Sequence, residues 1–428
     1  MGEELTVELT DMAHGGEAIG RHEGKVIFVP HAIAGEQVRV RVVQDRGRFA
    51  HARLLEVLSP STSRVKPPCP HSGLCGGCHW QHISYAAQLE HKRSIVAGQL
   101  GRIAGVRDIE VQPTLGMVDP WRYRNHAQFH VSSSGQLGFM AAQSHKVVSI
   151  ERCLIIHPLL EELFDALEME LPGLTGLSLR AGINTGEQMI VFEMAEDQAP
   201  DVEVTLPVSC VLLLSDGTPV TLLGSPHIHE RIAERVYQLS APSFFQVNTS
   251  QAEVLVQHVC STVRAEPGDV IIDAYCGVGT FALALAPMAG EVVGIESSAT
   301  AMADARVNAS EVGNVRFLEG AIESVLPTLE VVDPVVILDP PREGLGRGVF
   351  ASLLAMSPRR IVYVSCDPAT LARDLKGLLA GGYSLRNVQP IDMFPHTYHI
   401  ETVAVLERAQ GTVRAQPGLS QSTQSPFD

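Results

Sequence analysis

Residues 270–286 read VIIDAYCGVGTFALALA, and this stretch decides the fold of the C-terminal half. The apolar run through Asp273 predicts a buried strand, Gly277 and Gly279 predict a tight turn, and the apolar run after them predicts a helix. Glycine allows a close approach between backbone and ligand, and the first turn of a helix offers free N–H groups. A dinucleotide-binding turn would carry a third glycine, which is absent here. The stretch therefore indicates a nucleotide-type ligand without identifying it.

Three more predicted strands follow, and each ends in a chemically active residue. EVVGIES ends at Glu296, VVILDPPR contains Asp339, and RIVYVSCD contains Cys366. Because helices alternate with these strands from about residue 241, the pattern predicts a doubly wound α/β domain with a parallel sheet. Ligands of such sheets bind at the carboxyl ends of the strands. The order of glycine-rich, acidic and Asp-Pro-Pro strand ends resembles that of S-adenosylmethionine-dependent methyltransferases.

A thiol and a carboxylate are the candidate reactive groups. Cys366 closes a strand and opens a helix, a position that is expected to lower the pKa of a thiol. The stretch IDMFPHTYHIE gathers Asp392, His396, His399 and Glu401 within ten residues. A carboxylate near a thiolate indicates a nucleophile and a base that act in sequence.

The N-terminal half has a different sequence pattern, which is mostly typical of β-strands. Residues 4–58 alternate as several short strands, which predicts a small closed barrel of the oligonucleotide-binding kind. Ser84 is a plausible N-cap for a helix over 84–100, and the region up to 240 is otherwise mostly β with one helix near 158–169. The predicted domains are a barrel at 1–60, a β-rich central domain at 61–240 whose helix 84–100 is placed against the C-terminal domain, a catalytic domain at 241–408 and a disordered tail at 409–428.

Composition limits the function classes. The chain has 428 residues, 45% of them hydrophobic, and a formal charge of −16, which argues against a strongly cationic nucleic-acid coat. A local basic stretch nevertheless spans residues 37–53, for which a solvated sheet face is the alternative. No apolar run is long enough for a membrane span, and the acidic start lacks a secretory pattern, so a cytoplasmic protein is expected.

A second cluster of thiols lies at CPHSGLCGGCHWQH, residues 69–82. Cys69, Cys75 and Cys78 are spaced as C-x5-C-x2-C, and in a reducing compartment such a cluster indicates metal binding before a disulfide. A fourth ligand must come from elsewhere. The candidates are Cys153, Cys210, Cys260, Cys276, Cys366, His71, His79 and His82. Zinc and iron–sulfur clusters both take four thiolates, so residue chemistry alone leaves the two open.

Several motifs together resemble the RNA 5-methyluridine methyltransferase family. They are PSFFQVN, DAYCGVGTF, LDPPR, VSCDPAT and IDMFPHTYHIE, in the family's order. The likeness covers roughly residues 4–408 and includes a barrel of the TRAM type. It implies an N-terminal TRAM barrel, a central domain with an iron–sulfur site and a Rossmann-like methyltransferase domain.

The resemblance also assigns roles. Cys366 would add to C6 of uracil, C5 would then take the methyl group of S-adenosylmethionine, and Glu401 would remove the C5 proton. The implied S-adenosylmethionine contacts are Gln246, Tyr275, Thr280, Glu296 and Asp339. Tyr275 and Thr280 stand where relatives often carry Phe and Asn, and a further contact expected near residues 319–323 has no assigned residue.

The resemblance selects Cys153 as the fourth ligand of a 4Fe–4S cluster beside Cys69, Cys75 and Cys78. The expected partner is RNA in a single-stranded or looped region, because the target base must be flipped out. A uridine of 23S ribosomal RNA is favoured, and the protein is expected to be a monomer. Arginines are the expected phosphate contacts: Arg39, Arg41, Arg46, Arg48, Arg122 and Arg124. The alternatives are a transfer-RNA uracil-C5 methyltransferase, an exocyclic-amine methyltransferase suggested by DPPR, and a non-catalytic iron–sulfur RNA-binding protein.

Overall fold

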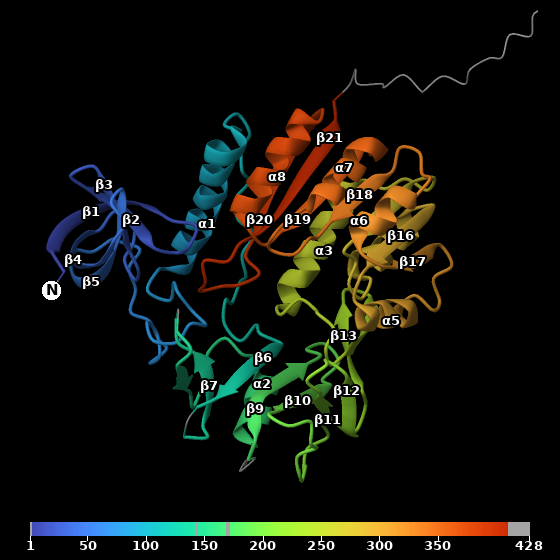
Figure 1. Cartoon of the computed structure of the whole chain (residues 1–428), viewed down its shortest axis with the longest axis horizontal. Helices are drawn as coiled ribbons and strands as arrows, with labels where there is room; N and C mark the ends of the chain where they lie inside the picture. Colours follow the sequence, from blue (N-terminus) through green and yellow to red (C-terminus); the bar gives the residue numbers. More distant parts are fainter. Residues whose placement is uncertain (1, 133, 143, 168–171, 410–428) are drawn as a thin grey trace, which may run out of the picture.

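The computed structural model describes residues 2–132, 134–142, 144–167 and 172–409. Figure 1 shows three parts: an N-terminal barrel in blue, a green central β region and a yellow-to-red C-terminal domain. The tail expected at 409–428 lies outside the described residues from residue 410 onward. The last residues of the helix expected at 158–169 also lie outside them.

The N-terminal part is a closed barrel with the strand order β1-β2-β3-β5-β4. Its strands are β1 (Glu4–Met12), β2 (Ala18–His22), β3 (Lys25–Val29), β4 (Gln37–Asp45) and β5 (Phe49–Ser59). Strict alternation buries Leu5, Val7 and Leu9 of β1 inside the barrel. The predicted N-terminal barrel is confirmed.

Helix α1 (Tyr85–Gln99) follows the cysteine-bearing segment and continues into a π-helical turn, η1 (Leu100–Ala104). Ser84 occupies the N-cap position as expected, but its side chain makes no capping hydrogen bond. Figure 1 shows α1 between the barrel and the C-terminal domain, and it contacts α8 (Pro368–Ala380) and β20 (Tyr383–Ile391). The helix therefore joins two parts of the chain that are almost 300 residues apart.

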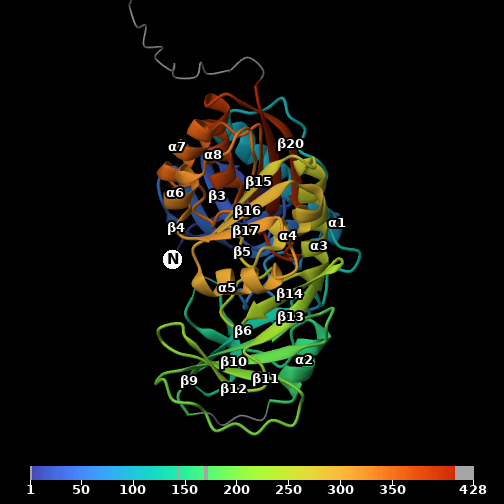
Figure 2. The same cartoon turned by 90° about the vertical axis from the view of Figure 1, so that its right-hand side faces the viewer.

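The central part is a seven-stranded sheet with the order β12-β11-β10-β9-β6-β7-β8 and its own apolar core. Its strands are β6 (His126–Val131), β7 (Leu137–Met140), β8 (Val147–Ser149), β9 (Leu174–Ala181), β10 (Gln188–Met194), β11 (Ser209–Leu213) and β12 (Pro219–Leu223). Helix α2 (Pro158–Asp165) packs on β9, and a separate hairpin of β13 (His227–Ile232) and β14 (Arg235–Ser240) leads to the C-terminal domain. Figure 2 shows this hairpin between the central sheet and the domain above it.

The C-terminal domain is a seven-stranded sheet with the order β17-β16-β15-β18-β19-β21-β20. Its strands are β15 (Val270–Ala274), β16 (Glu291–Glu296), β17 (Val315–Glu319), β18 (Val335–Leu338), β19 (Arg360–Ser365), β20 and β21 (Glu401–Arg408). Its helices include α3 (Thr249–Val263), α4 (Thr280–Leu285), α5 (Ala299–Asn308), α6 (Ile322–Val325), α7 (Arg347–Met356) and α8. Ile271 and Ile272 of β15 belong to different apolar clusters, so helices cover both faces of the sheet.

The sheet differs from the expected parallel pattern at one edge. Strands β15 to β19 are parallel, but β21 runs antiparallel to both β19 and β20. The reason is that β20 and β21 are joined by a loop over residues 392–400 rather than by a helix, so the chain reverses direction. This reversal brings the C-terminal motif to the same edge as the ends of the parallel strands.

No helix among the described residues is long and apolar enough to cross a membrane.

Candidate active site

The turn after β15 is built as the glycines indicated. Tyr275, Gly277 and Gly279 all have positive φ, and a Cβ atom on Gly279 would lie 2.9 Å from the Phe317 ring. Asp273 accepts a hydrogen bond from the Ala282 amide (2.8 Å) and so ties the strand to the first turn of α4. The turn therefore links the end of β15 to the start of α4 in a fixed geometry.

Four of the five residues expected to contact S-adenosylmethionine line one pocket. They are Gln246, Tyr275, Thr280 and Asp339. The fifth, Glu296, adjoins the pocket because its carboxylate accepts a hydrogen bond from the Gly277 amide (3.1 Å). Its other oxygen accepts from the amides of Ser297 and Ser298, each at 2.7 Å.

The contact left open near residues 319–323 stays unassigned. Glu323, in the first turn of α6, is exposed and does not line the pocket of Gln246 and Tyr275. Burial, followed by the charges of Glu323 and Asp374, raises the pKa of Tyr275 to about 12.

Strand pairing brings the thiol and the carboxylate together. In the antiparallel pair of β19 and β21, Ser365 lies opposite Thr402, so Cys366 and Glu401 meet at the same edge of the sheet. Asp339 reaches this edge from the end of β18, and Arg342 is the nearby cation. Cys366, Glu401 and Asp339 thus come from three different segments of the chain.

Burial makes this group of acids unusual. Glu401 is 4% exposed, and burial, followed by the neighbouring Asp339, raises its pKa well above the usual range. Burial also raises the pKa of Asp339 to about 7. The raised pKa favours the protonated form of Glu401, and in its ionised form the group is a stronger base than an exposed carboxylate.

The expected lowering of the thiol pKa is wrong. Burial, followed by the charges of Glu401 and Asp339, raises the pKa of Cys366 to about 11, and Arg342 offsets only part of this. The helix terminus does not compensate, because the Asp367 carboxylate accepts hydrogen bonds from the amides of Ala369 (3.0 Å) and Thr370 (2.8 Å). The thiol form of Cys366 is therefore favoured over the thiolate at neutral pH.

The other ionisable groups of the C-terminal motif do not face Cys366. Asp392 forms a fully buried ion pair with Lys92 of α1 (2.5 Å). His396 contacts Gln88 of the same helix, and His399 lies 3.5 Å from the Arg342 guanidinium. Only Glu401 of this group reaches the thiol, and the remainder hold the loop that precedes it.

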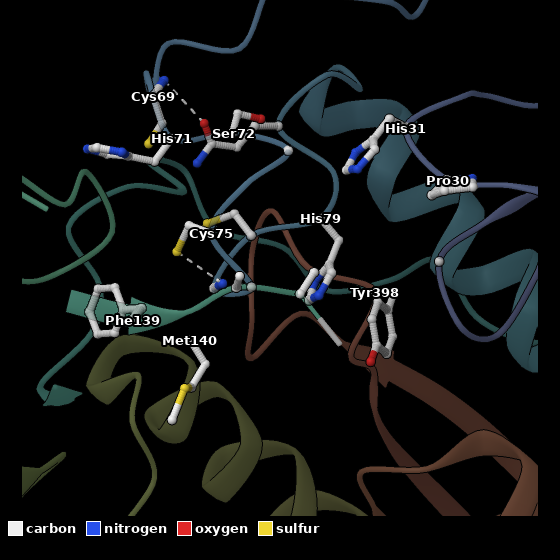
Figure 3. A pocket seen from close by; sticks show the side chains of 18 of the residues that line it. Pro30, His31, Cys69, His71, Ser72, Cys75, His79, Phe139, Met140 and Tyr398 are labelled. Atoms are coloured by element: carbon white, nitrogen blue, oxygen red, sulfur yellow. Dashed lines mark hydrogen bonds between the residues drawn. The ribbon is translucent and has the colours of Figure 1, made fainter. Parts of the chain in front are cut away.

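A second site forms around the four cysteines expected to hold a cluster. Cys69, Cys75, Cys78 and Cys153 line one cavity of about 950 Å³ between the barrel and the central domain. Figure 3 shows Cys69, Cys75, His79 and Tyr398 around this cavity. Cys210 instead lies in the core of the central sheet, and Cys260 lies on α3. Of the candidate fourth thiols, Cys153 is the one that the fold brings to the other three.

The thiols at this cavity are free and partly shielded from solvent. No disulfide links any of the eight cysteines, all of which lie in described parts of the chain. Burial, with a smaller contribution from the other three thiols, raises the pKa of Cys78 to about 12, and the hydrogen bond with Gln81 opposes this shift. The amide of Gly77 donates to the Cys75 sulfur (3.4 Å), a contact that stabilises a metal-bound thiolate.

Within residues 2–132, 134–142, 144–167 and 172–409, no group of three or more His, Cys, Asp and Glu side chains is arranged to hold a metal ion. The four cysteines line one cavity without forming such a group.

Two of the arginines expected to contact RNA are neutralised locally. Arg39 pairs with Glu4 and Glu56, and Arg41 pairs with Glu4. Arg53 and Arg124 instead line the cysteine cavity. Arg46 and Arg48, between β4 and β5, are exposed.

Comparisons with known proteins agree on one family. The profile described as tRNA (Uracil-5-)-methyltransferase matches residues 226–409, and that of the TRAM domain matches residues 1–55. An uncharacterised RNA methyltransferase of Halalkalibacterium halodurans is 37% identical over 94% of this chain and 96% of its own. One of Streptomyces avermitilis is 38% identical over 96% and 99%.

Among solved structures, the tRNA (uracil-54, C5)-methyltransferase of Pyrococcus abyssi is similar, with a TM-score of 0.75 and 29% identity. The match covers 94% of this chain and all of that one, which was solved with S-adenosyl-L-homocysteine. The likeness extends over all three parts of the fold.

Proposed function

Because this chain belongs to the RNA (uracil-5-)-methyltransferase family, as an S-adenosylmethionine-dependent enzyme with a TRAM domain, we propose that Cys366 and Glu401 carry out its reaction. The observation that supports this proposal is the meeting of a thiol and a buried carboxylate at one sheet edge, beside the pocket of Gln246 and Asp339. C5 of uracil is a weak nucleophile, so an unassisted transfer of the methyl group would be slow.

The proposed reaction has three steps: addition of the thiolate, transfer of the methyl group and elimination. The Cys366 thiolate adds to C6 of uracil, and the ring becomes an enolate that is nucleophilic at C5. C5 then takes the methyl group from the sulfonium of S-adenosylmethionine, which leaves as S-adenosylhomocysteine. Glu401 removes the C5 proton, the C6–S bond breaks, and the thiolate is restored. One proton passes to solvent for each methyl group transferred.

The raised pKa values account for the order of events. Burial and the neighbouring acids raise the pKa values of both Cys366 and Glu401. The sulfonium of S-adenosylmethionine would bring a positive charge to the site, and a nearby positive charge favours the ionised forms of thiols and carboxyls. The two groups would then become active only when the methyl donor is in place.

The substrate that we propose is a uridine in 23S ribosomal RNA, held partly by the TRAM barrel. Transfer RNA is the second candidate, since the Pyrococcus abyssi enzyme named for transfer RNA matches this chain over all three parts. The three-part build therefore does not by itself separate the two substrates. The number of target uridines is part of the same question.

Mapping of 5-methyluridine decides between these substrates. Ribosomal and transfer RNA from strains with and without the gene would be digested and examined by mass spectrometry. We expect 5-methyluridine to disappear from one 23S position and to return with the wild-type gene but not with a Cys366→Ala gene. Loss from transfer RNA alone would reject the ribosomal substrate, and no loss from either RNA would reject the proposed function.

We also propose that Cys69, Cys75, Cys78 and Cys153 hold a 4Fe–4S cluster. The cluster would supply a rigid cross-link between the segment before α1 and the central sheet, since methyl transfer as written above needs no electron. His71, His79 and His82 are not needed as ligands, because four thiolates complete the set.

Anaerobically purified protein should contain about four irons and a broad absorbance near 400 nm. Cys153→Ala should remove most of the iron, because three thiolates then remain. Cys210→Ala changes a core cysteine of the same domain and should retain it. Zinc in stoichiometric amount without iron or sulfide would contradict the proposal.

A further inference from the structure

The loop over residues 392–400 ends at Glu401 and contains the strained residue His396. Its φ is +65°, a left-handed conformation that is costly for a residue with a side chain. Such a conformation persists only where its surroundings hold it. The contacts that hold His396 therefore fix the position of the loop.

The cysteine-bearing segment supplies the first of these contacts. The amides of His79 and Trp80 both donate to the His396 carbonyl, each at 2.9 Å. His79 follows Cys78 directly in the chain, and its ring packs at 4.5 Å from that of Tyr398 in the loop. Trp80 is fully buried, and its indole N–H donates to Gly16 of the barrel (2.9 Å).

Gln88 of α1 connects the loop over residues 392–400 to the segment that follows the cysteines. Its side-chain oxygen accepts from the His396 amide (2.9 Å). Its side-chain nitrogen donates to the carbonyls of Trp80 (3.1 Å) and Ile83 (2.9 Å). Gln88 is fully buried, so none of these bonds can be replaced by water without opening the structure.

Three further contacts hold the loop in place. The Trp121 ring stacks on the His396 ring at 3.8 Å, and the Tyr123 hydroxyl donates to the Pro395 carbonyl (3.1 Å). The buried Lys92–Asp392 pair anchors the start of the loop to α1. The proposed base therefore follows a loop held by α1, the barrel and the cysteine segment together.

We propose that Gln88 is a positioning residue for the methyl transfer. Its hydrogen bonds hold His396 against the cysteine-bearing segment, and this contact fixes Glu401 beside Cys366. The inference rests on the proposed roles of Cys366 and Glu401. In this proposal the cysteine site has a structural role that needs no redox chemistry, because the residues that follow Cys78 bind directly to His396.

The test replaces Gln88 by methionine, which fills a similar volume without hydrogen bonds. Gln99→Met makes the same change at the other end of α1. Among the described residues, no hydrogen bond joins the Gln99 side chain to the loop. Hydrogen exchange of peptides covering 392–401 would be followed by mass spectrometry in full-length protein, together with kcat, the KM for S-adenosylmethionine and the fraction of RNA in an SDS-stable adduct.

We expect Gln88→Met to speed exchange in 392–401 about tenfold or more, since a buried hydrogen-bond set is lost. We expect kcat to fall about 10²-fold, because a displacement near 1 Å is enough to cost that much. The KM for S-adenosylmethionine should stay unchanged, and more adduct should accumulate because removal of the C5 proton is slowed. Gln99→Met should behave as wild type in every measurement.

Wild-type exchange in Gln88→Met would overturn the proposal, as would faster exchange with an unchanged kcat. If Gln88→Met does not fold, Gln88→Glu provides the measurement, since its carboxyl can still accept from His396 but cannot donate to both carbonyls. A wild-type protein that methylates no RNA would reject the proposed function instead, and the exchange data would still decide whether Gln88 holds the loop.

Discussion

Replacing Cys366 by alanine should reduce methyl transfer roughly 10⁴-fold or more, since the variant has no nucleophile to activate C5. Binding of S-adenosylmethionine should be unchanged, because Cys366 is not among the residues that line the pocket of Gln246, Tyr275, Thr280 and Asp339. Transfer of a tritiated methyl group to RNA and calorimetric titration with S-adenosylmethionine measure the two quantities separately.

Cys260→Ala is the matched control for this variant. Cys260 is a partly buried cysteine of α3, whose thiol pKa is also raised by burial, but it lies away from the sheet edge of Cys366. It should retain full transfer activity. A Cys366→Ala enzyme that still methylates uridine at the wild-type rate would eliminate the covalent route, whatever the control does.

Replacing Glu401 by glutamine should leave the first half of the reaction and stop the second. The Cys366 thiolate can still add to C6, and C5 can still take the methyl group. The C5 proton then has no acceptor, so turnover should fall about 10²- to 10⁴-fold, as is typical when a general base is removed. An SDS-stable protein–RNA adduct should accumulate, and denaturing gels with labelled RNA would detect it.

Glu407→Gln is the matched control, because Glu407 lies at the other end of β21 and pairs with Arg360 and Arg386. It should turn over normally and show no more adduct than the wild type. The double variant Cys366→Ala, Glu401→Gln should form no adduct. An adduct that persists in the double variant would show that another residue attacks the base, and the absence of any adduct in Glu401→Gln would argue against Glu401 as the base.

Much of the architecture was readable from local pattern. The strand, turn and helix of residues 270–286 depend on neighbours within a few positions, and so does the alternation that closes the N-terminal barrel. The antiparallel edge was missed, since the direction of β21 depends on which strand it pairs with.

The electrostatics of the site could not be predicted in the same way. Position at a helix terminus suggested a lowered pKa for Cys366, but the thiol is buried beside Glu401 and Asp339, and its pKa is raised to about 11. A pKa depends on every charge and on all the solvent around a group, most of which comes from remote segments. Sequence position describes only one of those contributions.

The sequence by itself determined the candidate residues: the cysteine cluster at 69–78, the glycine turn after Asp273, and the proposed pair of Cys366 and Glu401. Only the tertiary structure decided how they meet. It placed Cys153 in the cavity of the other three thiols and tied His396 to Gln88. The physical reason is range: backbone preferences and motif spacing act over a few residues, whereas a site closes through packing and hydrogen bonds between segments up to about 300 residues apart.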